Sequence, residues 1–153
     1  DPTECELVLA VVDLAHFART AQTQSDRAIF DMLSEFYELA GNTVEEGGGK
    51  VVKFMGDAAL IVFAGDAPHQ AVRSLRSLKD VIEDWLSAYN PVLKLQIRAH
   101  LGPVVCGPLG TVADKRFDVI GREVNELFLL RGGHFVLSNQ LEQRLGAGRD
   151  QEI

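Results

Sequence analysis

Two aspartates stand beside apolar segments that could hold them close together. Asp13 ends the apolar run in "CELVLAVVDLAHF", and Asp57 lies at the tip of a predicted β-hairpin, "KVVKFMGDAALIVF". Two uncompensated carboxylates at one spot repel each other strongly, and a divalent cation between them removes that repulsion. Ligation by oxygen alone, without His or Cys, selects hard ions. The pair therefore indicates a site for Mg²⁺ or Mn²⁺.

Both aspartates also have a purely structural interpretation. Gly-Asp is a favourable turn pair in a hairpin, and an aspartate after a strand often caps the next helix. Turn chemistry alone accounts for Asp57 taken by itself. The metal interpretation requires both residues to lie on neighbouring strands, and at this point the two interpretations remain open.

The surrounding pattern predicts the elements that would carry these aspartates. Continuous or alternating apolar residues indicate strands, and apolar spacings of three and four indicate helices. In chain order we expect a strand ending at Asp13, a helix over 25–44, a hairpin over 50–63, a helix over 67–89, a strand over 93–102, a glycine-spaced turn region over 102–110, a helix over 122–130, a strand at 135–138, and a short helix opened by Asn139 with Glu142 as its capping box.

This order of elements predicts an α+β fold. It corresponds to a ferredoxin-like βαββαβ core with an additional strand and helix, in a single domain over residues 1–153. In a ferredoxin-like sheet the first strand lies beside the hairpin formed by the second and third strands. We therefore expect Asp13 and Asp57 to meet at one edge of the sheet.

Composition narrows the partners and the compartment. The 153 residues carry a net charge of −7 and no basic run, which argues against nucleic acid or an anionic membrane as a binding partner. Cys5 and Cys106 fit buried, reduced thiols, so we expect a cytoplasmic protein. No apolar run reaches the length of a membrane span. Because the chain begins with Asp1, we expect it to be excised from a longer protein with fused sensor or regulatory domains.

Four segments resemble the catalytic domain of class III adenylate/guanylate cyclases. "LAVVDLAHF" and "KVVKFMGDAALIVF" resemble the family's two metal-site segments. "IRAHLGPVVCGPLG" resembles its H-x-G-x-V-x-x-G-x-x-G run, and "FDVIGREVN" its D-x-x-G-x-x-V-N segment. The residues that match these two motifs are His100, Gly102, Val104, Gly107 and Gly110, then Asp118, Gly121, Val124 and Asn125. The four segments follow the family's order and span almost the whole chain.

The resemblance implies a reaction and its metal ligands. Such enzymes convert a nucleoside triphosphate to a 3′,5′-cyclic monophosphate and pyrophosphate, with two Mg²⁺ or Mn²⁺ ions per site. By this resemblance Asp13 and Asp57 hold the ions, the carbonyl of Leu14 adds a contact, and backbone N–H groups from Ala15 to Phe17 bind the phosphates.

The resemblance also implies the substrate and a homodimer. Lys53 and Asp118 match the pair that recognises adenine, so the implied substrate is ATP and the product cyclic AMP. Asn125 matches the asparagine that orients the ribose or the phosphates. The active site of the family lies between two subunits, which implies a homodimer related by a two-fold axis.

Two residues depart from the family's pattern. Leu129 stands where the family usually places an arginine that neutralises charge on the α-phosphate, and Arg131 points to another side of the helix. His16 replaces a usual glycine. Losing one preorganised donor costs on the order of 10²–10³ in rate. The alternatives are therefore an adenylate cyclase of low turnover, a silent cyclase-like domain that binds nucleotide or dimerises, and, less well matched, a nucleotide polymerase-like domain.

Overall fold

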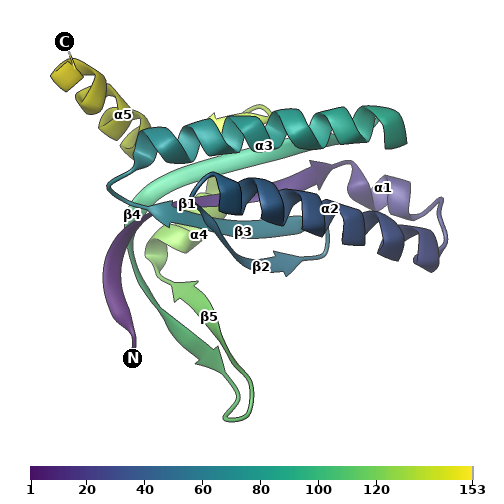
Figure 1. The fold of residues 1–153 in the computed structure, drawn as a ribbon, viewed down its shortest axis with the longest axis horizontal. Coiled ribbons are helices and arrows are strands. Elements are labelled where there is room, and N and C mark those ends of the chain that lie inside the picture. The colour runs from purple at the N-terminus through teal and green to yellow at the C-terminus, as the bar shows by residue number, and fades with distance from the viewer. Residues whose placement is uncertain (153) are drawn as a thin grey trace.

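The apolar runs and helical spacings of the chain form one sheet with helices on both faces (Figure 1). In this computed structural model the backbone is described for residues 1–152 and the side chains for residues 1–146. The elements are β1 (Thr3–Ala15), α1 (Phe17–Ala21), α2 (Asp26–Glu46), β2 (Lys50–Met55), β3 (Ala58–Ala64), α3 (Pro68–Tyr89), β4 (Lys94–Gly110), β5 (Lys115–Ile120), α4 (Arg122–Leu129), β6 (Phe135–Leu137) and α5 (Asn139–Glu152).

The sheet has the predicted ferredoxin-like core. Its strand order is β2-β3-β1-β4-β5, with β6 paired in parallel to β4 and the other pairs antiparallel. β1 is central, between β3 and β4, and its middle residues Val8 to Val12 are at most 1% exposed. This explains the continuous apolar run, because a strand covered on both faces has no polar side.

Helices on the two faces build two apolar layers. α2 and α3 cover one face, where Met32, Phe36, Leu75 and Ile82 pack against β1 and β3. Ser25 caps α2 by accepting a hydrogen bond from the backbone of Ala28 at 3.1 Å. The other face is smaller and includes Leu127 of α4. None of the helices described is both long and apolar enough to cross a membrane.

The structure corrects three predictions from the sequence. Residues 102–110 are not a turn region: β4 continues to Gly110, because this half of the strand pairs with β5 as well as with the start of β1. The short helix α1 was not predicted. Ser138, rather than Asn139, caps α5, since its Oγ accepts a hydrogen bond from the amide of Leu141 at 3.2 Å.

Candidate functional site

Asp13 and Asp57 lie side by side, as the predicted topology requires. Asp13 is near the end of β1, where it pairs with Ala58, the residue after Asp57. The turn that carries Asp57 is possible because Gly56 has a φ of 62°, a left-handed conformation that suits glycine. The backbone N–H groups of Asp57 and Leu14 lie near enough to the Asp57 carboxylate to lower its pKa. The hairpin tip is thus bound directly to the end of β1.

Helix α2 fixes this tip from the other side. The hydroxyl of Tyr37 donates a hydrogen bond to the carbonyl of Gly56 at 2.6 Å, and the Tyr37 ring stacks on Phe54 with centroids 4.0 Å apart. The pKa of Tyr37 is raised by burial and by the charge of Asp57. Sequence reasoning assigned Tyr37 only to an apolar helix face. Its hydroxyl, which an aromatic core position does not require, was the available signal.

The positive charge around Asp13 and Asp57 does not fully balance their two negative charges. Burial raises the pKa of Asp13, and the nearby charge of Asp57 raises it further, against the opposing charge of Arg98. Burial also raises the pKa of Asp57, against its backbone hydrogen bonds. A cation beside both groups would relieve this repulsion. The donor set is two carboxylates with no His or Cys, so the residues present fit a hard divalent ion.

A metal ion at this site would need ligands other than the side chains of Asp13 and Asp57. Within the described part of the chain no three His, Cys, Asp or Glu residues group closely enough to hold a metal. Backbone carbonyls, water and substrate oxygens would have to complete the coordination, as is usual for Mg²⁺. The contribution of the Leu14 carbonyl stays a prediction, as does phosphate binding at Phe17, which begins α1 directly after the site.

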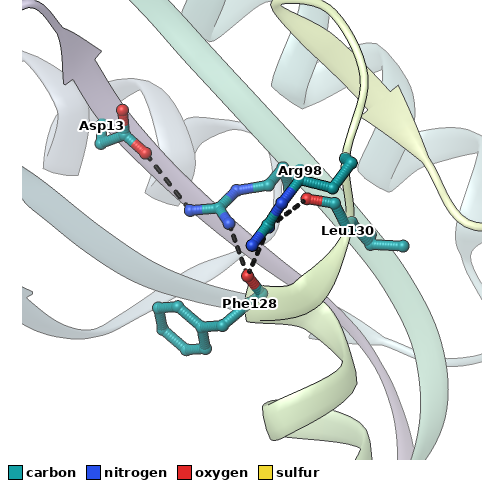
Figure 2. Close-up of polar contacts among 5 residues, drawn as sticks. Asp13, Arg98, Phe128 and Leu130 are labelled. Atoms are coloured by element: carbon teal, nitrogen blue, oxygen red, sulfur yellow. Dashed lines mark hydrogen bonds and ion pairs between the residues drawn. The ribbon is translucent and has the colours of Figure 1, made fainter.

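Arg98 is a member of this site that sequence reasoning did not single out. It lies on β4, and its Nη2 donates to Oδ2 of Asp13 at 3.4 Å while its Nη1 donates to the carbonyl of Phe128 at 2.8 Å (Figure 2). Asp13 pairs across the sheet with Gln96. Arg98 lies two residues after Gln96, and residues two apart on a strand share a face. Once the register is known, Arg98 is therefore placed on the same face of the sheet as Asp13.

Lys53 and Asp118 form a second constellation. Their strands, β2 and β5, are at opposite ends of the strand order, yet Nζ of Lys53 lies 3.2 Å from Oδ2 of Asp118. The sheet is therefore strongly curled, so that the β4–β5 hairpin approaches β2. Both residues line a cleft of about 860 Å³ whose other wall includes Tyr37 and Asn42 of α2. A cleft of this volume falls in the range typical of ligand sites.

Helix α4 carries the remaining predicted site residues. Asn125 and Leu129 are both exposed and lie one turn apart on the same face. Arg131 donates to the carbonyls of Leu130 and Phe128 at 3.1 and 3.4 Å, so it caps the end of this helix and does not replace the missing arginine. Across the described residues, no hydrogen bond or ion pair joins Asn125, Lys53 or Asp118 to Asp13 or Asp57.

The histidine and the first glycine of the third motif position α4. His100 is 3% exposed and is bonded through Nε2 to Glu123 at 3.0 Å and through Nδ1 to Ser138 at 2.8 Å. A Cβ on Gly102 would lie 2.5 Å from Cγ of Glu123, so only glycine allows this approach. These residues hold the helix that carries Asn125, which is a structural role.

The comparison with protein families decides the class of this site. The model of the adenylate and guanylate cyclase catalytic domain matches residues 4–127. The chain belongs to this family. It is thus a class III nucleotidyl cyclase domain, and the family typically uses divalent metals, in keeping with the carboxylate pair.

Relatives and solved structures agree with this assignment. Adenylate cyclase 2 of Rhizobium meliloti is 25% identical over 147 residues, which is 92% of this chain but only 40% of that protein. The structure of the adenylyl cyclase CyaB from P. aeruginosa matches with a TM-score of 0.85 at 17% identity, over 94% of this chain and 81% of that one. A dimeric guanylyl cyclase domain from Blastocladiella emersonii matches with a TM-score of 0.84 at 18% identity, over 96% and 87%. Both substrate classes share the fold, so the fold alone does not select ATP or GTP.

Proposed function

We propose that this domain converts ATP to 3′,5′-cyclic AMP and pyrophosphate. The observation that carries the proposal is the meeting of two half-buried, under-compensated carboxylates, Asp13 and Asp57, in a chain of the cyclase family. Asp13 and Asp57 would hold two Mg²⁺ or Mn²⁺ ions, which when bound would acidify the ribose 3′-hydroxyl and screen the phosphates. The 3′-oxygen attacks the α-phosphorus, and the bond to the β-phosphate breaks.

The choice of ATP rests on the Lys53–Asp118 pair. Lys53 can donate to N1 of adenine, and Asp118 can accept from its 6-amino group. Guanine presents the opposite pattern at these two positions, so the same pair would disfavour GTP. The separation of 3.2 Å between the two side chains supports a single base-recognition unit on the wall of the cleft.

The proposal places each active site between two copies of the chain. Asn125, Lys53 and Asp118 would serve the site whose ions the partner copy holds, with Asn125 orienting the ribose or the phosphates. Exposed large apolar side chains on the β4–β5 hairpin and α4 support such an interface, because apolar clusters on a surface often mark association. They are Val105, Leu109, Ile120, Phe128 and Leu129.

The chain is proposed to be the output domain of a longer cytoplasmic signalling protein. It covers 40% and 20% of the two Rhizobium meliloti adenylate cyclases that it resembles. The thiols of Cys5 and Cys106 are half-buried and free, with their sulfurs 3.1 Å apart, which suits a reducing compartment.

A catalytically silent, nucleotide-binding or dimerising domain is the second candidate. The exposed Leu129, 61% accessible at the position of the usual arginine, favours it. The carboxylate pair favours the enzyme, because two carboxylates this close together suit a divalent cation better than they suit a domain that binds none. The family assignment removes the polymerase-like alternative.

Incubation with ATP and Mn²⁺, followed by mass spectrometric detection of cyclic AMP, tests the enzyme. We expect product from the unaltered protein and a loss of at least about 10²-fold in Asp57→Ala, because the ions would lose a ligand. Asp66→Ala is the matched control, since Asp66 is an exposed aspartate in the turn at the opposite end of β3. Turnover that survives Asp57→Ala unchanged would refute the metal assignment.

Competition between ATP and GTP tests the base-recognition pair. Lys53→Glu should reduce the preference for ATP, because it replaces the donor with an acceptor beside Asp118. Arg73→Glu, the same charge reversal on an exposed position of α3, should leave the preference unchanged. An unaltered preference in Lys53→Glu would contradict this assignment.

A further inference from the structure

Arg98 lies between the proposed metal site and the helix that carries Asn125. On β4 it pairs with Val11 of β1 and Val136 of β6, and its side chain is 15% exposed. Figure 2 shows the guanidinium between the Asp13 carboxylate and the backbone at the end of α4. A cation is therefore already in place beside one of the two carboxylates.

The contacts of Arg98 are unequal in strength. Nη1 donates to the Phe128 carbonyl at 2.8 Å, an ordinary hydrogen bond, and the guanidinium lies 5.9 Å from the centre of the Phe128 ring. Nη2 reaches Oδ2 of Asp13 only at 3.4 Å. Nε is buried and finds no acceptor among the described residues. Arg98 is thus anchored to α4, and its ion pair with Asp13 is the exchangeable contact.

A divalent ion and this guanidinium would compete for the same carboxylate. Asp13 has one oxygen engaged by Arg98, and an ion that uses both oxygens must displace it. An ion that uses only the other oxygen would still lie close to a positive charge, and like charges disfavour each other. In either arrangement the presence of Arg98 weakens ion binding.

We propose that Arg98 sets the affinity of the Asp13–Asp57 pair for its divalent ion by competing with that ion for Asp13. The inference rests on the proposed metal site and assigns it a specific determinant of affinity. The competing pair is partly exposed, and such pairs typically contribute up to about 1 kcal/mol, so removing Arg98 should tighten ion binding about two- to fivefold. Arg98 acts through Asp13 and is therefore a positioning residue.

The test measures binding of Mn²⁺ alone, by the electron paramagnetic resonance of the free ion, with all variants compared at one pH. The variants are Arg98→Gln, which removes the charge, and Arg98→Lys, which keeps it on a shorter side chain. Arg131→Gln is the matched control, because Arg131 also donates to the Phe128 carbonyl but has no contact with Asp13. Asp57→Asn shows whether binding uses the proposed site.

We expect the dissociation constant to fall about two- to fivefold in Arg98→Gln, by a smaller factor in Arg98→Lys, and not at all in Arg131→Gln. The melting temperature gives a second readout. Arg98→Gln without metal should melt lower than the unaltered protein, because Asp13 has lost its counter-ion, and added Mn²⁺ should raise its melting temperature by more. A merely structural role for Arg98 would lower stability without tightening Mn²⁺ binding.

The outcomes separate the two proposals. If Asp57→Asn abolishes Mn²⁺ binding while Arg98→Gln binds no more tightly than the unaltered protein, the metal site stands and the role of Arg98 is refuted. If Mn²⁺ binding is the same in every variant, including Asp57→Asn, both are refuted. Should Arg98→Gln fail to fold, Arg98→Lys decides, since unchanged or weaker binding there contradicts the proposal.

Discussion

His16 has a left-handed backbone conformation, which suits glycine better than histidine. It joins β1 to α1 with φ 71° and ψ 13°, and it is the only residue other than glycine with positive φ among those the structure describes. A left-handed conformation costs an L-residue with a side chain roughly 1–2 kcal/mol, and glycine avoids that cost. The departure from the family's glycine is therefore a source of strain directly after the Asp13 strand.

Replacing His16 by glycine should stabilise the protein. We expect the free energy of unfolding to rise by about 0.5–1 kcal/mol, since relief of the left-handed strain exceeds the added entropy of the unfolded chain. Urea unfolding followed by the fluorescence of Trp85, the single tryptophan, measures this change. His16→Ala keeps the strain and should not stabilise. Equal stability of the two variants would contradict the argument.

At the scale of elements, a half-buried polar contact fixes the start of β4 against α3. Oε2 of Glu83 accepts hydrogen bonds from Nζ of Lys79 at 3.0 Å and from the amide of Leu95 at 3.3 Å. Lys79 also donates to the carbonyl of Leu95 at 2.9 Å. This contact sets the position of the strand that carries Arg98 three residues further along.

The Glu83 contact predicts a pH-dependent contribution to stability. Burial raises the pKa of Glu83, but Lys79 and the amide of Leu95 outweigh it and leave that pKa lowered. A lowered carboxyl pKa stabilises the fold above the unfolded value of about 4.3 and loses this effect as the pH falls through the folded value. Glu83→Gln should therefore cost about 1 kcal/mol at pH 7 and much less near pH 3.

Urea unfolding across this pH range measures the effect of Glu83→Gln. Asp80→Asn, an exposed position on the same helix, is its control and should change stability little at either pH. A cost for Glu83→Gln that persists undiminished at pH 3 would show that the charge of Glu83 does not carry the contact.

At the scale of the whole molecule, the groups proposed for one reaction come from separate elements, and within the described residues no hydrogen bond or ion pair joins them to the two carboxylates. The carboxylate pair lies at the β2–β3 hairpin tip, whereas Asn125 lies on α4 and Lys53–Asp118 lines the cleft. In the proposed homodimer, a second copy of the chain would bring these groups together. One group that the proposed composite site lacks is the cation that Leu129 does not supply.

Leu129→Arg tests whether the rest of the site is competent. We expect cyclic AMP formation to rise by as much as 10²–10³-fold, the typical contribution of one preorganised donor to a charged transition state. Val112→Arg adds the same charge at an exposed position, 98% accessible, in the β4–β5 turn, and should have no such effect. A dimeric Leu129→Arg protein without any turnover would favour the silent domain.

The local sequence pattern was sufficient to predict a helix or strand wherever a residue's sequence neighbours determine its environment. The helical spacing of Phe36 and Ala40 and the continuous apolar run of β1 both predicted the observed elements. The convergence of Asp13 and Asp57 followed from the strand order alone. Lys53 and Asp118 were paired only by resemblance, because 65 residues and the curl of the sheet separate them in the chain.

The amino-acid sequence by itself determined the family and the ferredoxin-like order of elements, because these depend on periodicity and on motifs read in order. Only the tertiary structure decided that Arg98 faces Asp13, that Tyr37 secures the hairpin tip, and that β4 runs on through its glycines to pair with β5. Those contacts join distant segments through register and sheet curvature, and the pattern of residues along a chain does not specify either one.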